Sequence, residues 1–278
     1  MSEASVEDRA QFETIVATVE ESGRLGRLAL NRPERLNAIG ARMLCELAEA
    51  ARWFDAHREL RVVIVSGAGR AFSAGADLKD TPVGEGLPGS GGSWLYRREV
   101  GQYGLRMADA IEQMRAITIA RVHGHVVGGG VVLVAACDLR VAAEDALFTI
   151  PEVDLGVPLA WGGIPRLVRE IGPAMTKELV MTCRPFTPAE AKALGFVNRV
   201  VPAAELDRAV ESLAGEIMSK PSVPVTITKD HANAVSRAMG AGLTSFADGD
   251  VLLAAVADPE SREAARAYAA SKWGKRRG

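Results

Sequence analysis

The sequence predicts an α/β fold that ends in a helical C-terminal part, and three observations support this prediction. Strand patterns alternate with helical patterns over roughly the first two thirds of the chain. From residue 187 onward the character changes, and the last quarter is predicted to be helical. At 278 residues, of which 48% are hydrophobic, the chain is long enough to bury a sizeable core.

The alternation can be followed element by element from the N-terminal side. The stretch "GRLGRLALN" predicts a strand that ends at Asn31, and apolar residues then recur at helical spacing over residues 43–54. The stretch "RVVIVSG" is typical of a buried strand and stops at Gly67. A second helix, marked by apolar residues over 105–114, leads into the strand "ITIARVHG".

The C-terminal part begins after one more strand-turn-strand pattern, "LRVAAEDALFTI", and a helix expected between Gly163 and Gly172. Thr187 and Glu190 then stand in capping-box order, and Gly195 is expected to end that helix. Four further helices are expected, at residues 204–218, 225–239, 243–257 and from 259 onward.

Composition excludes several classes of protein. The net charge of -2 gives no electrostatic argument for a nucleic-acid partner. The three cysteines, Cys45, Cys137 and Cys183, lie too far apart for a zinc site, so no metal is expected. The N-terminus lacks the pattern of a signal peptide, and the longest nearly apolar run, residues 126–137, is too short to span a membrane. We therefore expect a cytoplasmic protein without a membrane span.

Two nucleotide-binding motifs are excluded by their spacing, and one catalytic motif stays open. Gly67 and Gly69 follow a strand, but Phe72 stands where a dinucleotide fingerprint has its third glycine. The run "HGHVVGGG" lacks the Lys-Ser or Lys-Thr pair of a P-loop. The stretch "AFSAG" approaches a nucleophile elbow with Ser73 at its centre. A serine hydrolase is therefore an alternative, with a base from among His57, His123, His125 and His231.

A pair of loops gives the stronger chemical indication. "SAGAD" follows one strand and "GGG" follows another, and their small residues let a ligand approach bare backbone. The segment after Gly129 is expected to be helical, so its free N–H groups and the positive end of its dipole favour an oxyanion. Two such loops are able to direct two N–H groups at one oxygen.

Four motifs together resemble the crotonase superfamily, the enoyl-CoA hydratases and isomerases. They are "LNRPERLNAI" at 30–39, "AFSAGADLK" at 71–79, "HGHVVGGGVVLVAACD" at 123–138 and "FTIPEVDLG" at 148–156. The resemblance covers nearly the whole chain. It implies a crotonase-like spiral of strand-strand-helix units over residues 1–200, which carries the acyl-CoA site. It also implies a helical part over 201–278 that mediates assembly into a trimer or a dimer of trimers.

The resemblance implies a ligand and a set of site residues. The ligand is an acyl-CoA thioester, bound as substrate, with no permanently bound cofactor. The backbone N–H groups of Ala76 and Gly129 are expected to form the hole around the thioester oxygen. The residues expected to line the CoA side are Leu36, Ala74, Ala76, Leu78 and Lys79.

The acid–base residues indicate which reaction to expect. Many hydratases of the family carry two glutamates, of which this chain keeps the second, Glu152, whereas Val132 occupies the first position. Ala160 stands where dienoyl-CoA isomerases of the family carry an aspartate. A single base beside an oxyanion hole suffices to remove a proton alpha to the thioester and return it at the gamma carbon. We therefore expect Glu152 to catalyse conversion of 3-enoyl-CoA to 2-enoyl-CoA. The alternatives are hydration with water held by another group, and an acyl-CoA binder without activity.

Overall fold

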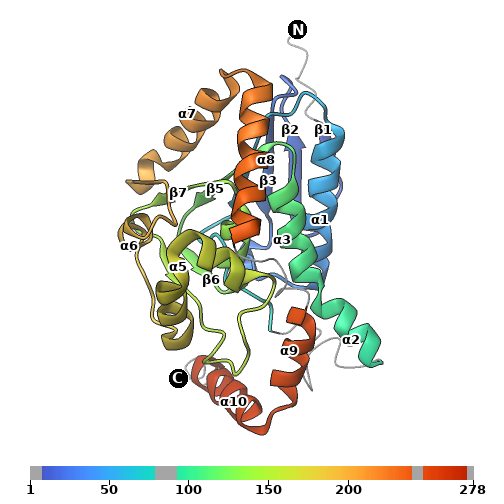
Figure 1. The fold of residues 1–278 in the computed structure, drawn as a ribbon, viewed down its shortest axis with the longest axis vertical. Coiled ribbons are helices and arrows are strands. Elements are labelled where there is room, and N and C mark those ends of the chain that lie inside the picture. The colour runs from blue at the N-terminus through green and yellow to red at the C-terminus, as the bar shows by residue number, and fades with distance from the viewer. Residues whose placement is uncertain (1–7, 79–92, 240–246, 274–278) are drawn as a thin grey trace.

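A seven-stranded, mostly parallel sheet forms the centre of the computed structural model (Figure 1), which describes residues 8–78, 93–239 and 247–273. The strand order is β1-β2-β3-β4-β5-β7-β9, and only β1 with β2 and β2 with β3 pair antiparallel. The bounds are β1 Asp8–Ala10, β2 Ile15–Val19, β3 Leu25–Leu30, β4 Val62–Gly67, β5 Ile117–Val122, β7 Leu139–Ala143 and β9 Arg199–Val201.

Helices cover both faces of this sheet. The helices are α1 Ala41–Ala56, α2 Trp94–Gly101, α3 Tyr103–Gln113, α4 Gly129–Ala136, α5 Gly163–Thr182, α6 Pro188–Ala193, α7 Leu206–Met218, α8 Ser222–Met239, α9 Asp248–Ala257 and α10 Pro259–Trp273. Two short 3-10 helices, η1 Pro33–Arg35 and η2 Ala203–Glu205, lie in the loops. Figure 1 shows α9 and α10 at the end of the molecule opposite to β1.

The parallel strands are buried on both faces because alternate residues enter two separate cores. Val63 and Val65 of β4 belong to a core shared with α1, α3 and α4, whereas Val62 and Ile64 belong to a core shared with α7. Strands buried on both faces are nearly continuously apolar, as the "RVVIVSG" stretch is. The predicted α/β class is confirmed. Because α7 packs on the sheet, the first helix of the C-terminal part shares a core with the spiral.

A second, two-stranded sheet positions the residues of interest. Its strands, β6 (His125–Val127) and β8 (Leu147–Thr149), pair parallel, so their carboxyl ends lie side by side. The loop after β4 joins this sheet through a parallel bridge between Ser73 and Val126. Three chain segments that are far apart in sequence therefore end at the same edge.

Two local features differ from the sequence-based expectation. The helix expected to stop at Gly172 resumes at once, because Gly172 (φ 76°) only kinks α5, which continues to Thr182. Only half of the expected capping box forms: the Thr187 hydroxyl accepts a hydrogen bond from the Glu190 N–H at 3.2 Å. The Glu190 carboxylate is instead paired with Arg184 at 2.7 Å.

Candidate active site

Glu152 and the glycine run meet because the two strands of the two-stranded sheet end side by side: Gly128 directly follows β6, and Glu152 comes three residues after the end of β8. The Gly128 N–H donates a hydrogen bond to the Thr149 carbonyl at 2.9 Å, which holds the two strand ends together. A Cβ added to Gly128 would lie 2.3 Å from Glu152 Oε1 and 3.3 Å from Oε2. The carboxyl group therefore lies against the Cα of Gly128, next to the residue that starts α4. Only glycine leaves this space, and its φ of 47° also favours glycine.

One oxygen of the Glu152 carboxyl is shielded from solvent, while the residue as a whole is half-buried. Its Oε2 atom is buried and accepts no hydrogen bond from the part of the chain that the structure describes. Burial raises the pKa of this carboxyl from its ordinary value of 4.5 to about 7, against a smaller opposing effect of a hydrogen bond from its own backbone. A buried carboxyl with a pKa near neutrality has the properties of a general base.

The loop after β4 lies directly against the glycine run. The Ser73 N–H donates to His125 O, and the Val127 N–H donates to Ser73 O, both at 3.0 Å. A Cβ on Gly75 would lie 2.8 Å from Val127 O, so the two backbones approach closely there. The two small-residue loops predicted to act together are thus in contact.

The backbone N–H groups of Ala76 and Gly129 are not used in the hydrogen bonds of the neighbouring bridge and helix. The Ile39 N–H donates to Gly75 O at 2.8 Å and the Asp77 N–H donates to Ile39 O at 2.9 Å, so the intervening Ala76 N–H faces away from Ile39. Gly129 is the first residue of α4, and an N–H at that position has no acceptor within its own helix. These are the two N–H groups that the resemblance to the crotonase superfamily implies for the oxyanion hole.

The other predicted residues of the CoA side are placed by the same loops. Ala74 donates its N–H to the Leu36 carbonyl at 2.8 Å, which joins the loop before α1 to the loop after β4. Ala74, Leu78 and Leu36 are half-buried. Lys79 lies outside the described residues. Asp77 is buried and paired with Arg32 at 2.9 Å.

The first glutamate position of the hydratases is a core position here. Val132 is 1% exposed, and a Cβ on Gly163 would meet its Cγ2 atom at 2.9 Å. Leu159 packs on the same side of Gly163. The face of α4 one turn beyond Gly129 is therefore closed by apolar side chains rather than by a second carboxylate.

Ser73 is a structural residue. Its side chain is fully buried, and its hydroxyl donates to the Asn37 carbonyl at 2.9 Å while accepting from the Gly75 N–H at 3.1 Å. Within the described ranges, no hydrogen bond joins the Ser73 hydroxyl to the imidazole ring of a histidine. The serine-hydrolase alternative lacks the nucleophile–base contact that it needs.

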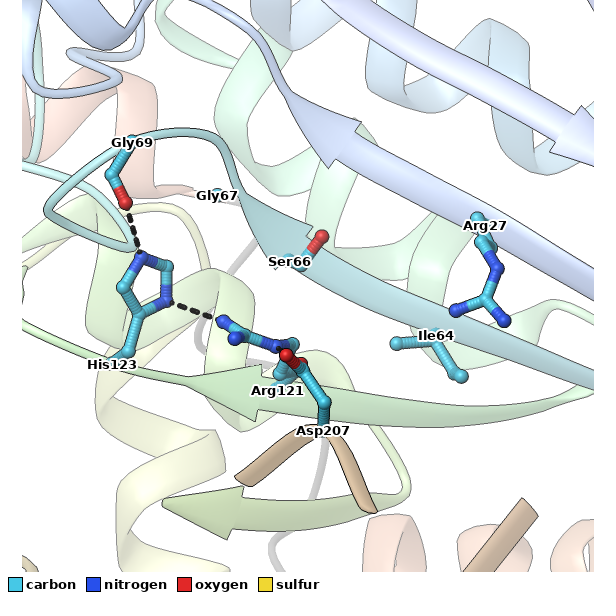
Figure 2. A pocket seen from close by; sticks show the side chains of 8 residues that line it. All are labelled: Arg27, Ile64, Ser66, Gly67, Gly69, Arg121, His123 and Asp207. Atoms are coloured by element: carbon cyan, nitrogen blue, oxygen red, sulfur yellow. Dashed lines mark hydrogen bonds and ion pairs between the residues drawn. The ribbon is translucent and has the colours of Figure 1, made fainter. Parts of the chain in front are cut away.

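A separate pocket of about 380 Å³ lies on the sheet face that α7 covers (Figure 2). Arg121 pairs with Asp207, and its guanidinium also contacts His123 Nδ1 at 3.0 Å. His123 Nε2 contacts the Gly69 carbonyl at 2.9 Å, so Nε2 carries the ring proton. Burial and the neighbouring Arg121 lower the pKa of His123. These polar groups satisfy one another, and Glu152 does not line this pocket.

Across the described ranges, no cluster of three or more histidine, cysteine, aspartate or glutamate side chains is arranged to hold a metal ion. Nor does any helix in those ranges have the length and apolar character needed to cross a membrane.

Trp161 and Arg140 help to position α4, and the sequence analysis did not single out either residue. The Trp161 indole packs against Gly129, and the Arg140 guanidinium binds the C-terminal end of α4. The sequence signal for Trp161 is its place before the glycine pair at 162–163. Arg140 is a single arginine in a strand, and its sequence context gives no signal of this role.

Comparison with known proteins agrees with this geometry. The family model described as enoyl-CoA hydratase/isomerase matches residues 20–272. A crotonyl-CoA hydratase of Syntrophomonas wolfei is 36% identical, over 80% of this chain and 82% of its own length. A peroxisomal Delta(3,5)-Delta(2,4)-dienoyl-CoA isomerase of Arabidopsis thaliana is 38% identical, over 73% of this chain and 74% of its own length.

Solved structures give the same result at the level of the fold. An enoyl-CoA hydratase/isomerase from Xanthobacter autotrophicus superposes with a TM-score of 0.78 at 28% identity. That match covers 95% of this chain and 99% of the other. The family-model match over most of the chain and the two relatives above 30% identity lead to one conclusion. The chain belongs to the enoyl-CoA hydratase/isomerase family, within the crotonase superfamily, and is an enzyme of the crotonase type.

Proposed function

We propose that this enzyme shifts the double bond of an enoyl-CoA thioester from carbon 3 to carbon 2, with Glu152 as the single base. One observation carries the proposal: the Glu152 carboxyl lies beside the start of α4, and the next turn of that helix presents a buried valine, Val132, instead of a second carboxylate. Addition of water across a double bond needs a second group to orient and activate the water. A proton shuttle between two carbons needs only one.

The chemistry divides between Glu152 and the two loops. The N–H groups of Ala76 and Gly129 bind the thioester oxygen and stabilise the enolate that forms when the alpha proton leaves. Loss of one such donor typically raises the activation barrier by about 3 to 4 kcal/mol. Glu152 takes the alpha proton and returns it to the gamma carbon. The burial of Oε2 supports this shuttle, because the proton is held away from solvent between the two transfers.

The remaining parts of the proposal concern the ligand and the assembly. Leu36, Ala74, Leu78 and Lys79 contact the CoA portion of the substrate, which is bound only during turnover. The chain assembles as a homotrimer or a dimer of trimers in the cytoplasm. Three apolar side chains of α8, Val223, Ile227 and Val235, are exposed in the single chain, which supports an assembled state. Light scattering after size-exclusion chromatography measures the number of subunits.

The proposed reaction is tested with a substrate panel. We expect 3-hexenoyl-CoA to be converted to 2-hexenoyl-CoA, followed by absorbance of the conjugated thioester and by chromatography. The similarity to a crotonyl-CoA hydratase supports a second candidate function, hydration of the double bond. Because Val132 cannot hold water, another polar group would have to do so. That candidate requires 3-hydroxybutyryl-CoA to form from crotonyl-CoA. Binding of CoA esters without turnover of any panel member would instead identify a binder without activity.

The raised pKa of Glu152 sets the pH dependence of the proposed reaction. The base acts only when it is ionised, so kcat/KM for 3-hexenoyl-CoA should rise with pH and level off above about 7. An unshifted carboxyl would give a plateau that begins near its ordinary value of 4.5. A pH–rate profile of the free enzyme between pH 5 and 9 distinguishes these outcomes. A flat profile over this range would contradict the assignment.

A further inference from the structure

The Trp161 indole lies between two glycines that come from different helices. A Cβ on Gly104 of α3 would be 2.1 Å from Trp161 Cγ, and a Cβ on Gly129 of α4 would be 2.1 Å from Cζ3. Both glycines therefore leave space that the ring fills. The five-membered ring packs on α3 and the six-membered ring packs on the first residue of α4.

The backbone of Trp161 is held in a conformation that costs free energy. Its φ of 60° lies in the left-handed region, and Gly162 follows with a φ of 69°. A non-glycine residue in this region costs about 1 kcal/mol or more, and it persists only where the surroundings impose it.

Two charged side chains impose this conformation. Arg166 Nη1 donates to the Gly162 carbonyl at 3.2 Å, and the Gly162 N–H donates to Asp248 Oδ2 at 2.7 Å. Arg166 is itself 4% exposed and is fixed by Asp109 at 2.7 Å and by Glu112 at 2.5 Å. The position of the indole is thus determined from α3, α5 and α9 together.

The indole and the substrate oxygen contact the same residue. An oxygen bound by the Gly129 N–H lies about 2.9 Å from its nitrogen. The ring packs against the Cα of that residue, and Trp161 as a whole is half-buried. The acyl carbons next to the thioester carbonyl therefore enter the space beside the ring, whereas the distal end of a long chain lies farther away.

We propose that Trp161 is a specificity-determining residue whose indole walls the acyl compartment at the thioester end and excludes substituents on carbon 2. The inference rests on the proposed acyl-CoA site but not on the proposed reaction. It predicts selection for acyl groups that are unbranched next to the carbonyl. One methyl group in a closely fitted site typically changes affinity by about tenfold to two hundredfold.

Binding of three saturated, unreactive thioesters tests this proposal by calorimetry: butyryl-CoA, 2-methylbutyryl-CoA and octanoyl-CoA. We expect the wild type to bind butyryl-CoA about tenfold or more tightly than 2-methylbutyryl-CoA. Trp161→Ala should remove most of this preference, and Trp161→Phe should reduce it in part. Trp161→Phe keeps an aromatic ring in the space and so tests the proposal even if the alanine variant does not fold.

The matched control is Trp53→Ala, because Trp53 lies near the C-terminal end of α1, where it packs on Phe54 and His57. It should keep the wild-type preference. The proposal is overturned if the Trp161 variants also keep that preference, or if they gain affinity only for octanoyl-CoA. If the wild type binds none of the three thioesters, the proposed acyl-CoA site fails and the inference fails with it. Preserved binding without isomerase activity overturns the proposed reaction alone.

Discussion

Glu152→Gln will reduce isomerisation of 3-hexenoyl-CoA by at least about a hundredfold, because an amide cannot accept the alpha proton. It will also raise the free energy of unfolding at pH 8. The folded carboxyl has a pKa of about 7 against an ordinary value of 4.5, so the wild type loses stability as pH rises through this window. The shift corresponds to about 3 kcal/mol at most, which glutamine does not lose. Steady-state kinetics and urea unfolding measure the two effects.

The control is Glu144→Gln, which removes an exposed carboxylate from the turn between β7 and β8. It should leave both activity and stability close to those of the wild type. A Glu152→Gln variant with wild-type turnover would remove Glu152 from the mechanism. A variant that is less stable than the wild type at pH 8 would show that the carboxyl is not destabilised by burial.

Arg140→Met will destabilise the protein by about 3 to 5 kcal/mol, the largest stability effect that we expect. Arg140 is 3% exposed and donates to the carbonyls of Val134, Ala135 and Cys137 at 3.0, 3.1 and 2.9 Å. Ala135 lies in the last turn of α4 and Cys137 directly follows the helix, so their carbonyls find no N–H donor further along it, whereas Val134 O also accepts from the Cys137 N–H at 3.2 Å. Methionine fills much of the volume but removes the Arg140 donors from the Ala135 and Cys137 carbonyls and from Glu170, which pairs with Arg140 at 2.8 Å.

The matched control is Arg208→Met, because Arg208 is 78% exposed and its pair with Glu205 at 2.8 Å lies at the surface. Its loss should cost about 1 kcal/mol or less. Denaturant unfolding of the two variants gives the comparison. Equal stability of the two would mean that Arg140 does not hold α4, the helix whose first residue supplies Gly129.

The fold was predictable where local patterns are strong. The buried strand ending at Gly67 and the helix over 43–54 follow from apolar spacing alone, and both form as β4 and α1. The interruption of the helix at Gly172 was predictable, but the immediate start of a second helical segment after it was not. A glycine with a φ of 76° ends one helical segment, and only packing of the following residues decides whether another starts at once.

The candidate site was predictable to a lesser extent, because it depends on contacts between distant segments. The motifs pointed to Glu152 and the glycine run, but their meeting at the ends of β6 and β8 is a property of the sheet. Burial of the Glu152 carboxyl and of Val132 is likewise tertiary. Trp161 acquires its position from Arg166 and Asp248, and the second of these lies 86 residues beyond Gly162.

In the proposed reaction, the Glu152 carboxyl moves a proton between two carbons of the substrate. The most direct measurement uses 3-hexenoyl-CoA with deuterium at carbon 2, in ordinary water, under single-turnover conditions with the products resolved by NMR. Because Glu152 Oε2 is inaccessible to solvent, we expect a measurable fraction of the 2-hexenoyl-CoA to carry the transferred deuterium at carbon 4. Product that carries only protium at carbon 4 would contradict it.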